Sequence, residues 1–322
     1  MITIQVGTTG GPEVLRAVES ERPQAEPGRL VVQVEAAGVN FIDTYQRGGL
    51  YPMDLPFVLG LEGAGRVVEV GEGVEGFGPG DRVAWSDAQG SYAEYASVAA
   101  DRAVPVPDSV STEIAAAVML QGLTAHYLAT STFPLQPGHR CLIHAGAGGV
   151  GRLLIQIAKS RGAEVFTTVG SPEKADVAAS AGADHVIQYR ESSFREVIES
   201  LAGERPLDVV YDGVGASTFD DGIALLKPRG MMVTFGNASG PVPPVAPLVL
   251  SRNGSLFLTR PILADYVRQR SELLERAADL FTWIEAGTLE VLIGATFPLT
   301  EAADAQRALE GRSTTGKVLL VP

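Results

Sequence analysis

The chain has 322 residues, 45% of them hydrophobic, which suits two domains of ordinary size, each with a buried core. Its formal net charge of -13 repels nucleic-acid phosphates, and no run of lysine or arginine offsets that charge, so we expect no nucleic-acid partner. A single cysteine excludes a disulfide framework, and no window of about eighteen apolar residues could span a membrane. The first residues, MITIQVGTTGG, lack the pattern of a secretion signal, so we expect a cytoplasmic protein.

The N-terminal part of the chain, from Met1 to about Pro107, carries short strand-like segments. These segments are ITIQV (2–6), RLVVQVEAAGV (29–39), GRVVEVG (65–71) and DRVAW (81–85). Glycine-rich turns such as GEGVEGFGPGD separate them, which predicts an antiparallel, barrel-like domain. Around Ser111 the pattern becomes helical and continues to about residue 130.

From Cys141 onward, strands and helices alternate. The predicted strands are 141–144, 164–170, 185–189, 207–215, 230–236 and 255–260, and predicted helices lie between the first five. Such alternation implies right-handed crossovers and a parallel sheet. A long helix over 266–287 follows, then a strand, a helix and a last strand, GKVLLV (316–321), which we expect to return to the first domain.

The stretch HAGAGGVGRLLIQIAK joins the first strand of the predicted parallel sheet to its first helix. Gly146, Gly148 and Gly151 have the G-x-G-x-x-G spacing of a dinucleotide-binding loop, in which unpaired amides at the helix start attract a pyrophosphate. Small residues alone would also fit a plain tight turn, but five more strands follow this one. A methyltransferase loop is the other alternative, although it usually has an acidic residue at the end of the second strand.

That acidic residue is missing, because the second strand ends TTVGSPEK. Ser171 could simply cap the next helix, with Pro172 at its first position, and Lys174 could be a solvated surface residue. A cation facing the adenosine ribose, with no competing carboxylate, instead favours a 2′-phosphate. The sequence therefore predicts NADPH rather than NADH as the cofactor.

With these residues in hand, the chain resembles the zinc-free quinone oxidoreductase (zeta-crystallin-like) branch of the medium-chain dehydrogenase/reductase superfamily, and within it the bacterial NADPH:quinone reductases. The likeness rests on AAGVNFIDTYQRGGLYP, LPFVLGLEGAGRVVEVG, QGLTAHYL, HAGAGGVG, VTFGNASG and STTGKVLLVP. It implies an α/β fold: a GroES-like, β-barrel-type catalytic domain formed by 1–121 and 263–322, and a Rossmann domain over 122–262 with a doubly wound, parallel, six-stranded sheet.

Zinc-dependent relatives carry a catalytic cysteine in the segment that resembles VNFIDTY and a His-Glu pair in the one that resembles LGLEGAG. This chain has Asp43 in the first segment and Leu61-Glu62 in the second, and its four histidines lack metal-like spacing. We therefore expect no metal and assign Glu62 to bracing its loop. Without a Lewis acid, the expected reaction is zinc-independent hydride transfer to an activated acceptor, a quinone or an α,β-unsaturated carbonyl.

The resemblance implies a set of site residues lining a cleft between the two domains. The expected catalytic residues are Asn40, Tyr45 and Tyr51. The expected cofactor-binding residues are Asn40, Phe41, Ile42, Asp43, Thr44, Tyr45, Thr124, Tyr127, Gly148, Gly149, Val150, Gly170, Ser171, Lys174, Tyr189, Gly213, Phe235, Gly236, Asn237, Phe257, Leu258, Thr259, Arg312 and Lys317. Several have a structural alternative: turn or cap for Asn40 and Asp43, packing for Tyr45, Tyr51, Thr124 and Tyr127, and surface charge for Arg312 and Lys317.

The sixth strand would leave an unpaired edge, and relatives pair this edge across a two-fold axis, so we expect a homodimer. Two other functions remain open at this point. One is an enoyl-thioester reductase, which would need a basic groove for a pantetheine-phosphate arm. The other is a non-enzymatic NADPH-binding protein, either structural, as in the lens crystallins, or nucleic-acid-binding.

Overall fold

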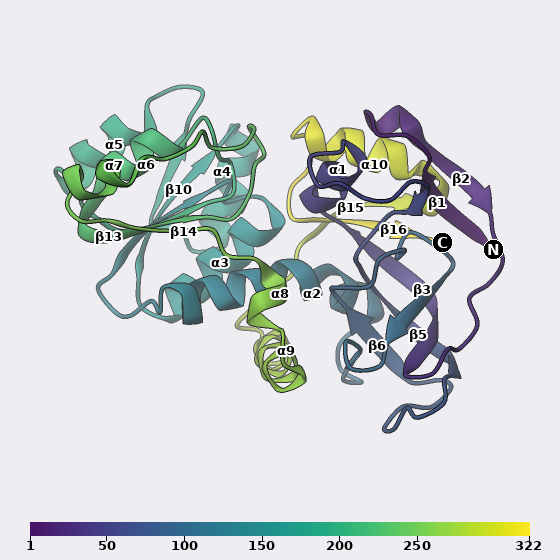
Figure 1. Ribbon diagram of the computed structural model, residues 1–322. Coiled ribbons are helices and arrows are strands. Elements are labelled where there is room, and N and C mark those ends of the chain that lie inside the picture. The colour runs from purple at the N-terminus through teal and green to yellow at the C-terminus, as the bar shows by residue number, and fades with distance from the viewer. The chain divides into compact units, whose positions relative to one another are not determined.

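The computed structural model describes the whole chain, Met1–Pro322, as two compact units (Figure 1). Unit 1 combines Met1–Leu123 with Val267–Pro322, and unit 2 is Thr124–Tyr266. None of the helices combines the length and the apolar character needed to span a lipid bilayer.

Unit 1 is built on a seven-stranded sheet with the order β15-β16-β3-β5-β6-β8, in which β7 also pairs with β3. Its strands are β3 (Arg29–Val39), β5 (Glu62–Val70), β6 (Arg82–Trp85), β7 (Tyr95–Ala99), β8 (Val104–Pro105), β15 (Ile293–Pro298) and β16 (Lys317–Val321). A second sheet, in the order β2-β1-β4, joins β1 (Ile2–Val6), β2 (Leu15–Glu19) and β4 (Phe57–Val58). Apolar residues of these strands and of the segments between them form one buried core, in which Trp85 and Tyr92 are the largest side chains.

The helices of unit 1 are α1 (Phe41–Arg47), the start of α2 (Thr112–Tyr127), α9 (Arg270–Glu285) and α10 (Ala302–Glu310), with short 3-10 turns at Pro12–Val14 and Leu299–Glu301. The C-terminal segment belongs to this unit because β16 pairs antiparallel with β3, with Val318 opposite Val39. That pairing brings the residues before β16 next to the start of α1, more than 270 positions away in the sequence.

Unit 2 contains a six-stranded parallel sheet with the order β11-β10-β9-β12-β13-β14. The strands are β9 (Arg140–His144), β10 (Glu164–Val169), β11 (His185–Gln188), β12 (Leu207–Asp212), β13 (Leu226–Thr234) and β14 (Phe257–Thr259). The helices are α3 (Gly149–Ser160), α4 (Pro172–Ser180), α5 (Phe194–Ala202), α6 (Phe219–Leu225), α7 (Pro247–Arg252) and α8 (Leu263–Tyr266). A π-helical turn, Leu128–Thr132, follows α2. The strand order reverses beside β9, which is the Rossmann arrangement and places the ligand-binding edge at the carboxyl ends of the strands.

The α/β fold class predicted from the sequence is confirmed, with a largely antiparallel β-sheet unit and a six-stranded parallel sheet. The predicted helix over 266–287 is wrong at its start, because α9 begins only at Arg270, where Glu272 accepts a hydrogen bond from the backbone N–H of Gln269 (3.4 Å). Val267 is buried in the preceding irregular segment, so its apolar side chain mimics helical periodicity without a helix. The short helices α1, α7 and α8 were not predicted from the sequence.

Candidate active site and cofactor-binding loops

The glycine loop of unit 2 connects β9 to α3 through Ala145–Gly148. A Cβ at Gly146 would collide with the Thr167 side chain, and one at Gly151 would collide with the Ala145 carbonyl oxygen. Both glycines are therefore needed for close packing of the loop and helix. Gly148 is the N-cap of α3 and has no side chain to cap it, so the amides of the first turn are open to an anion.

Neither Gly170 nor Tyr189, the residues that directly follow β10 and β11, carries a carboxylate, and the nearest one to Gly170 along the chain, Glu173, is exposed in the first turn of α4 and hydrogen-bonds to Ser171. A Cβ at Gly170 would lie 2.7 Å from the Tyr189 hydroxyl oxygen, so the phenol lies directly against the Gly170 backbone. Ser171 Oγ accepts a hydrogen bond from the Lys174 backbone N–H (3.4 Å), and Pro172 occupies the first helical position, so Ser171 does cap α4. The tip therefore offers hydroxyl groups and the partly exposed Lys174, as a 2′-phosphate would require.

At the end of β12, Asp212 is committed to its own loop. Its carboxylate accepts hydrogen bonds from the backbone N–H groups of Val214 (2.7 Å) and Gly215 (3.0 Å) and from Thr218 Oγ1 (2.9 Å). The loop that follows β13 packs on this one: a Cβ at Gly213 would be 3.1 Å from the Phe235 ring, and one at Gly236 would collide with the Gly213 carbonyl. The structure thus brings together Gly213, Phe235 and Gly236, three of the predicted cofactor-binding residues.

Other predicted cofactor residues in unit 2 differ in exposure. Tyr127 is 1% exposed and stacks on Tyr266, with ring centroids 4.1 Å apart, and burial raises the pKa of its hydroxyl. Thr124 is also buried. These positions fit the packing alternative. Phe257, by contrast, is 57% exposed on the edge strand β14, and Leu258 and Thr259 are half-buried.

In unit 1, the outer face of α1 is aromatic. Phe41 and Tyr45 lie one helical turn apart with ring centroids 6.3 Å apart, and Tyr51 meets Tyr45 edge-on at 5.4 Å. The Tyr51 backbone N–H also donates to the Tyr45 carbonyl (3.1 Å), which fixes the following loop against the helix. The three rings are half-buried, so this face can contact a flat apolar ligand.

The inner face of α1 is buried and polar. Asp43 is fully buried, and its Oδ2 accepts hydrogen bonds from the Asn40 backbone N–H (2.8 Å) and the Tyr92 hydroxyl (2.7 Å). Burial raises the pKa of Asp43 to about 7, although both hydrogen bonds oppose the shift. Burial also raises the pKa of Tyr92. Asp43 therefore cannot present its carboxyl to a bound cofactor, and it acts as the capping residue that the sequence analysis gave as the alternative.

Beside Asp43 lies a buried ion pair between Lys317 and Glu62, which are 1% and 0% exposed. The Lys317 ammonium also donates to Asn40 Oδ1 (2.8 Å), and the Leu120 backbone N–H donates to Glu62 Oε1 (2.6 Å). This place differs from the phosphate contact expected for Lys317, because the pairing of β16 with β3 turns its side chain inward. Glu62 itself is the first residue of β5, and its partners Lys317, Asn40 and the Leu120 backbone N–H all lie outside its own loop.

Arg312, the other basic residue expected at the phosphates, is exposed in the loop that joins α10 to β16. Its φ of 56° is in the left-handed region. Nowhere in the structure do three or more His, Cys, Asp or Glu side chains converge as they would around a metal ion.

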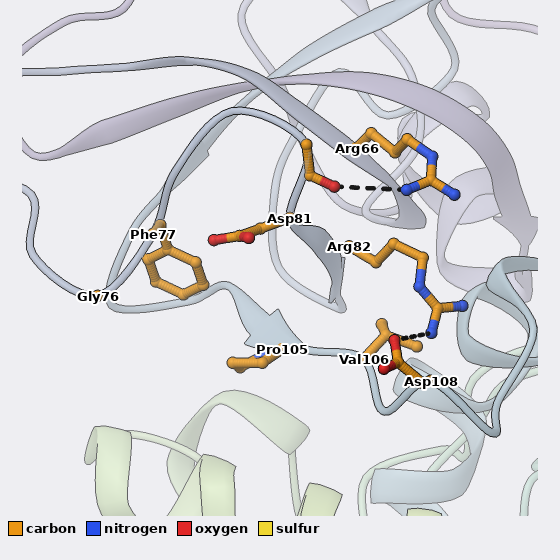
Figure 2. Close-up of a pocket in the computed structure, with 9 residues that line it drawn as sticks. Arg66, Gly76, Phe77, Asp81, Arg82, Pro105, Val106 and Asp108 are labelled. Carbon is orange, nitrogen blue, oxygen red and sulfur yellow. Dashed lines mark hydrogen bonds and ion pairs between the residues drawn. The ribbon is translucent and has the colours of Figure 1, made fainter.

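Figure 2 shows a separate surface hollow in unit 1, with a volume of about 360 Å³. The guanidinium groups of its two arginines bond to neighbouring groups of the protein. Arg66 pairs with Glu35 (3.0 Å), and Arg82 donates to the Val110 and Pro107 carbonyl oxygens (2.8 and 2.6 Å). We therefore assign this hollow no role in the reaction.

Comparisons with known proteins agree with this geometry. Residues 26–108 match the family described as alcohol dehydrogenase GroES-like domain, and residues 149–281 match the one described as zinc-binding dehydrogenase. The chain is therefore a medium-chain dehydrogenase/reductase, with the catalytic and nucleotide-binding parts that define this class.

Its full-length relatives narrow the assignment. A quinone oxidoreductase of Salmonella typhimurium is 46% identical over 319 residues, covering 97% of each chain. Among solved structures, a mycobacterial protein complexed with NADPH is 47% identical with a TM-score of 0.97, and the Escherichia coli quinone oxidoreductase complexed with NADPH is 42% identical with a TM-score of 0.98; each covers 100% of both chains. The chain belongs to the quinone oxidoreductase family.

Proposed function

We propose that this protein uses NADPH to reduce quinones and other activated α,β-unsaturated carbonyls. The observation that carries the proposal is the end of β10, where Gly170 takes the place of an acidic residue, the Tyr189 hydroxyl lies against it, and Ser171 caps the helix whose first turn carries Lys174. Together with the open amides at the start of α3, this edge fits a dinucleotide that bears a 2′-phosphate. When bound, NADPH supplies the hydride.

Within unit 2, the pyrophosphate would be held by Gly148, Gly149 and Val150, which are partly exposed at the start of α3. The adenosine end would be held by Gly170, Ser171, Lys174 and Tyr189. In unit 1, exposed Arg312 remains the proposed basic contact to the phosphates, and Lys317 is withdrawn from that role because of its burial.

The acceptor gains negative charge on an oxygen when it is reduced, and hydrogen-bond donors stabilise that charge. We propose the hydroxyls of Tyr45 and Tyr51 as those donors, because both rings belong to the half-buried aromatic face of α1. Asn40 is 4% exposed, and its amide bonds to neighbours inside unit 1, so we propose it as a positioning residue.

The direct test is NADPH oxidation, followed at the nicotinamide absorbance band, with 1,4-benzoquinone or 9,10-phenanthrenequinone as acceptor. We expect turnover with NADPH and much slower turnover with NADH at the same concentration. Reactions without acceptor and reactions without protein are the controls. Failure of every quinone and enone in a panel to oxidise NADPH would refute the proposed activity.

We also propose a homodimer that forms through the edge strand β14. Phe257 on this strand is 57% exposed, and two further apolar residues of unit 2, Ile262 after the strand and Leu248 on α7, are 54% and 61% exposed. Sedimentation should give twice the chain mass of 33.8 kDa. Ile262→Glu should shift the protein toward that single-chain mass, whereas a monomeric wild type would refute the proposal.

The proposed compartment is the cytoplasm, and recovery of the protein in another cell fraction would contradict it.

A further inference from the structure

The buried ion pair of unit 1 lies over a residue that has no side chain. Gly38 is opposite Glu62 in the pairing of β3 with β5, and opposite Leu319, two residues after Lys317, in the pairing of β3 with β16. A Cβ at Gly38 would lie 2.7 Å from Lys317 Cε and closer still to Glu62 Oε2. The glycine thus leaves the space in which the ammonium and the carboxylate meet.

Every hydrogen-bonding position of the Asn40 side chain is directed at this pair and its neighbours. Its Nδ2 donates to Glu62 Oε2 (2.7 Å) and to the Gly38 carbonyl (3.2 Å). Its Oδ1 accepts from Lys317 Nζ (2.8 Å) and from Gln121 Nε2 (3.3 Å). An amide offers two donors and two acceptor positions, so this one is saturated, and its orientation is fixed by opposite charges at its two ends.

Asn40 immediately precedes α1, and the rest of the helix is fixed from the same side. The Asn40 backbone N–H donates to Asp43, which also binds Tyr92. At the other end of α1, buried Arg47 donates to Gln306 Oε1 (2.5 Å) and Glu310 Oε1 (2.7 Å) on α10. The inner face is therefore anchored at both ends, while the outer face carries Tyr45.

We propose that Lys317 and Glu62, meeting over Gly38 and gripping Asn40, form a clamp whose role is to position α1 and its aromatic face for the acceptor. This clamp consists of Gly38, Asn40, Glu62 and Lys317. Burying an ion pair has a large desolvation cost, and an apolar pair of similar volume often gives equal stability. The ion pair contributes direction instead, because its two charges orient an amide that methyl groups could not orient. The catalytic part of this inference rests on the proposed function.

The main test replaces both charges by apolar side chains of similar length, in the double variant Lys317→Met/Glu62→Met. This variant has no unpaired buried charge, so we expect it to fold. Two readouts should change: amide hydrogen exchange in α1 should accelerate at least about tenfold, and kcat with an enone should fall about ten- to a hundredfold, the cost of misplacing a reacting group. The Kd for NADPH, measured by fluorescence titration, should stay unchanged, which separates positioning from general damage.

A second variant breaks the clamp without removing a charged group. Gly38→Ala places a methyl group where the ion pair lies and should reproduce both changes. Its matched control is Gly7→Ala in the same unit, because a Cβ at Gly7 would have nothing within 4 Å. For the double variant, the control is Arg22→Met/Glu69→Met, which removes a pair whose side chains are 40% and 47% exposed.

Unchanged hydrogen exchange in α1 in both clamp variants would overturn the proposal, as would accelerated exchange with unchanged kcat. These outcomes are distinct from failure of the proposed function. If wild-type protein turns over no quinone or enone, the proposed function falls. The hydrogen-exchange comparison then still decides whether these residues hold α1.

Discussion

The clamp in unit 1 and the glycine loop in unit 2 both depend on glycines, but the two regions use the missing side chains in opposite ways. At Gly38 the space is filled by the protein's own charges, and Asn40 has no hydrogen-bonding position left. At Gly148 the helix start has no cap, while Ser171 caps α4 and Ser193 caps α5. A region that positions its neighbours saturates its polar groups, and a region that binds a ligand keeps them open.

The ion pairs of the two units differ in their exposure to solvent. Lys317 and Glu62 are almost inaccessible, whereas Lys159 and Asp184 in unit 2 are each 34% exposed and join the end of α3 to the segment before β11. An exposed pair in water contributes little, because solvent screens both charges. Loss of one buried partner instead leaves a charge in a medium that cannot solvate it. Removing one charge of the buried pair should therefore lower the free energy of unfolding far more than removing one charge of an exposed pair.

The largest effect should come from Glu62→Gln. This change leaves the Lys317 ammonium buried without its counter-charge, and we expect a loss of about 3–5 kcal/mol in the free energy of unfolding. Glu69→Gln, in the exposed pair with Arg22, should cost at most about 1 kcal/mol. Urea unfolding of both variants measures the difference, and equal losses would break the comparison between buried and exposed charge.

The second effect concerns the open region. Lys174→Ala should weaken NADPH binding about ten- to a hundredfold, since a charge-assisted hydrogen bond to phosphate contributes roughly 1.5–3 kcal/mol. Binding of NADH, which lacks the 2′-phosphate, should hardly change. Lys227→Ala is the matched control, because Lys227 pairs with Asp208 near the opposite ends of the strands (2.8 Å). Equal weakening of both cofactors by Lys174→Ala would remove Lys174 from the phosphate site.

A third effect is a pH dependence that arises from the closed region. Asp43 has a pKa of about 7 in the folded protein against an ordinary value of 3.8, so between these values only the folded state holds the proton. The contribution of Asp43 to the free energy of unfolding should therefore fall as the pH rises from about 4 to 7, by about 1.4 kcal/mol per pH unit, and level off above the folded pKa. In Asp43→Asn, whose amide oxygen can still accept from Asn40 and Tyr92, this component should vanish. Identical pH profiles for both proteins would contradict the burial of an ionisable Asp43.

The smallest effect should come from the aromatic face that the clamp positions. Tyr45→Phe and Tyr51→Phe keep the rings and remove the donors. A quinone stabilises its own anion, so we expect less than about a tenfold loss of kcat with quinone and a larger loss with a less activated enone. The ratio of the two rates in each variant is the measurement. A ratio unchanged in both would leave these tyrosines as lining and sharpen the case that the face acts by shape alone.

The parallel sheet, the barrel-like unit and the glycine loop could be predicted from the sequence, because these features depend on local signals. Alternating apolar residues, the spacing of Gly146, Gly148 and Gly151, and the glycine in place of an acid directly after β10 all lie within short windows. The same windows located α3 and offered capping as the alternative role of Ser171, since helix ends are set by neighbouring residues.

Only the tertiary structure decided the clamp. Lys317 and Glu62 are 255 positions apart, and each looks in the sequence like an ordinary surface charge or loop brace. They meet because β16 and β5 flank β3, and because Gly38 leaves room between them. The same pairing turned a lysine expected at a phosphate into a buried partner of Asn40. Burial and strand neighbours are properties of the assembled sheet, and no local pattern encodes which distant charge will face which.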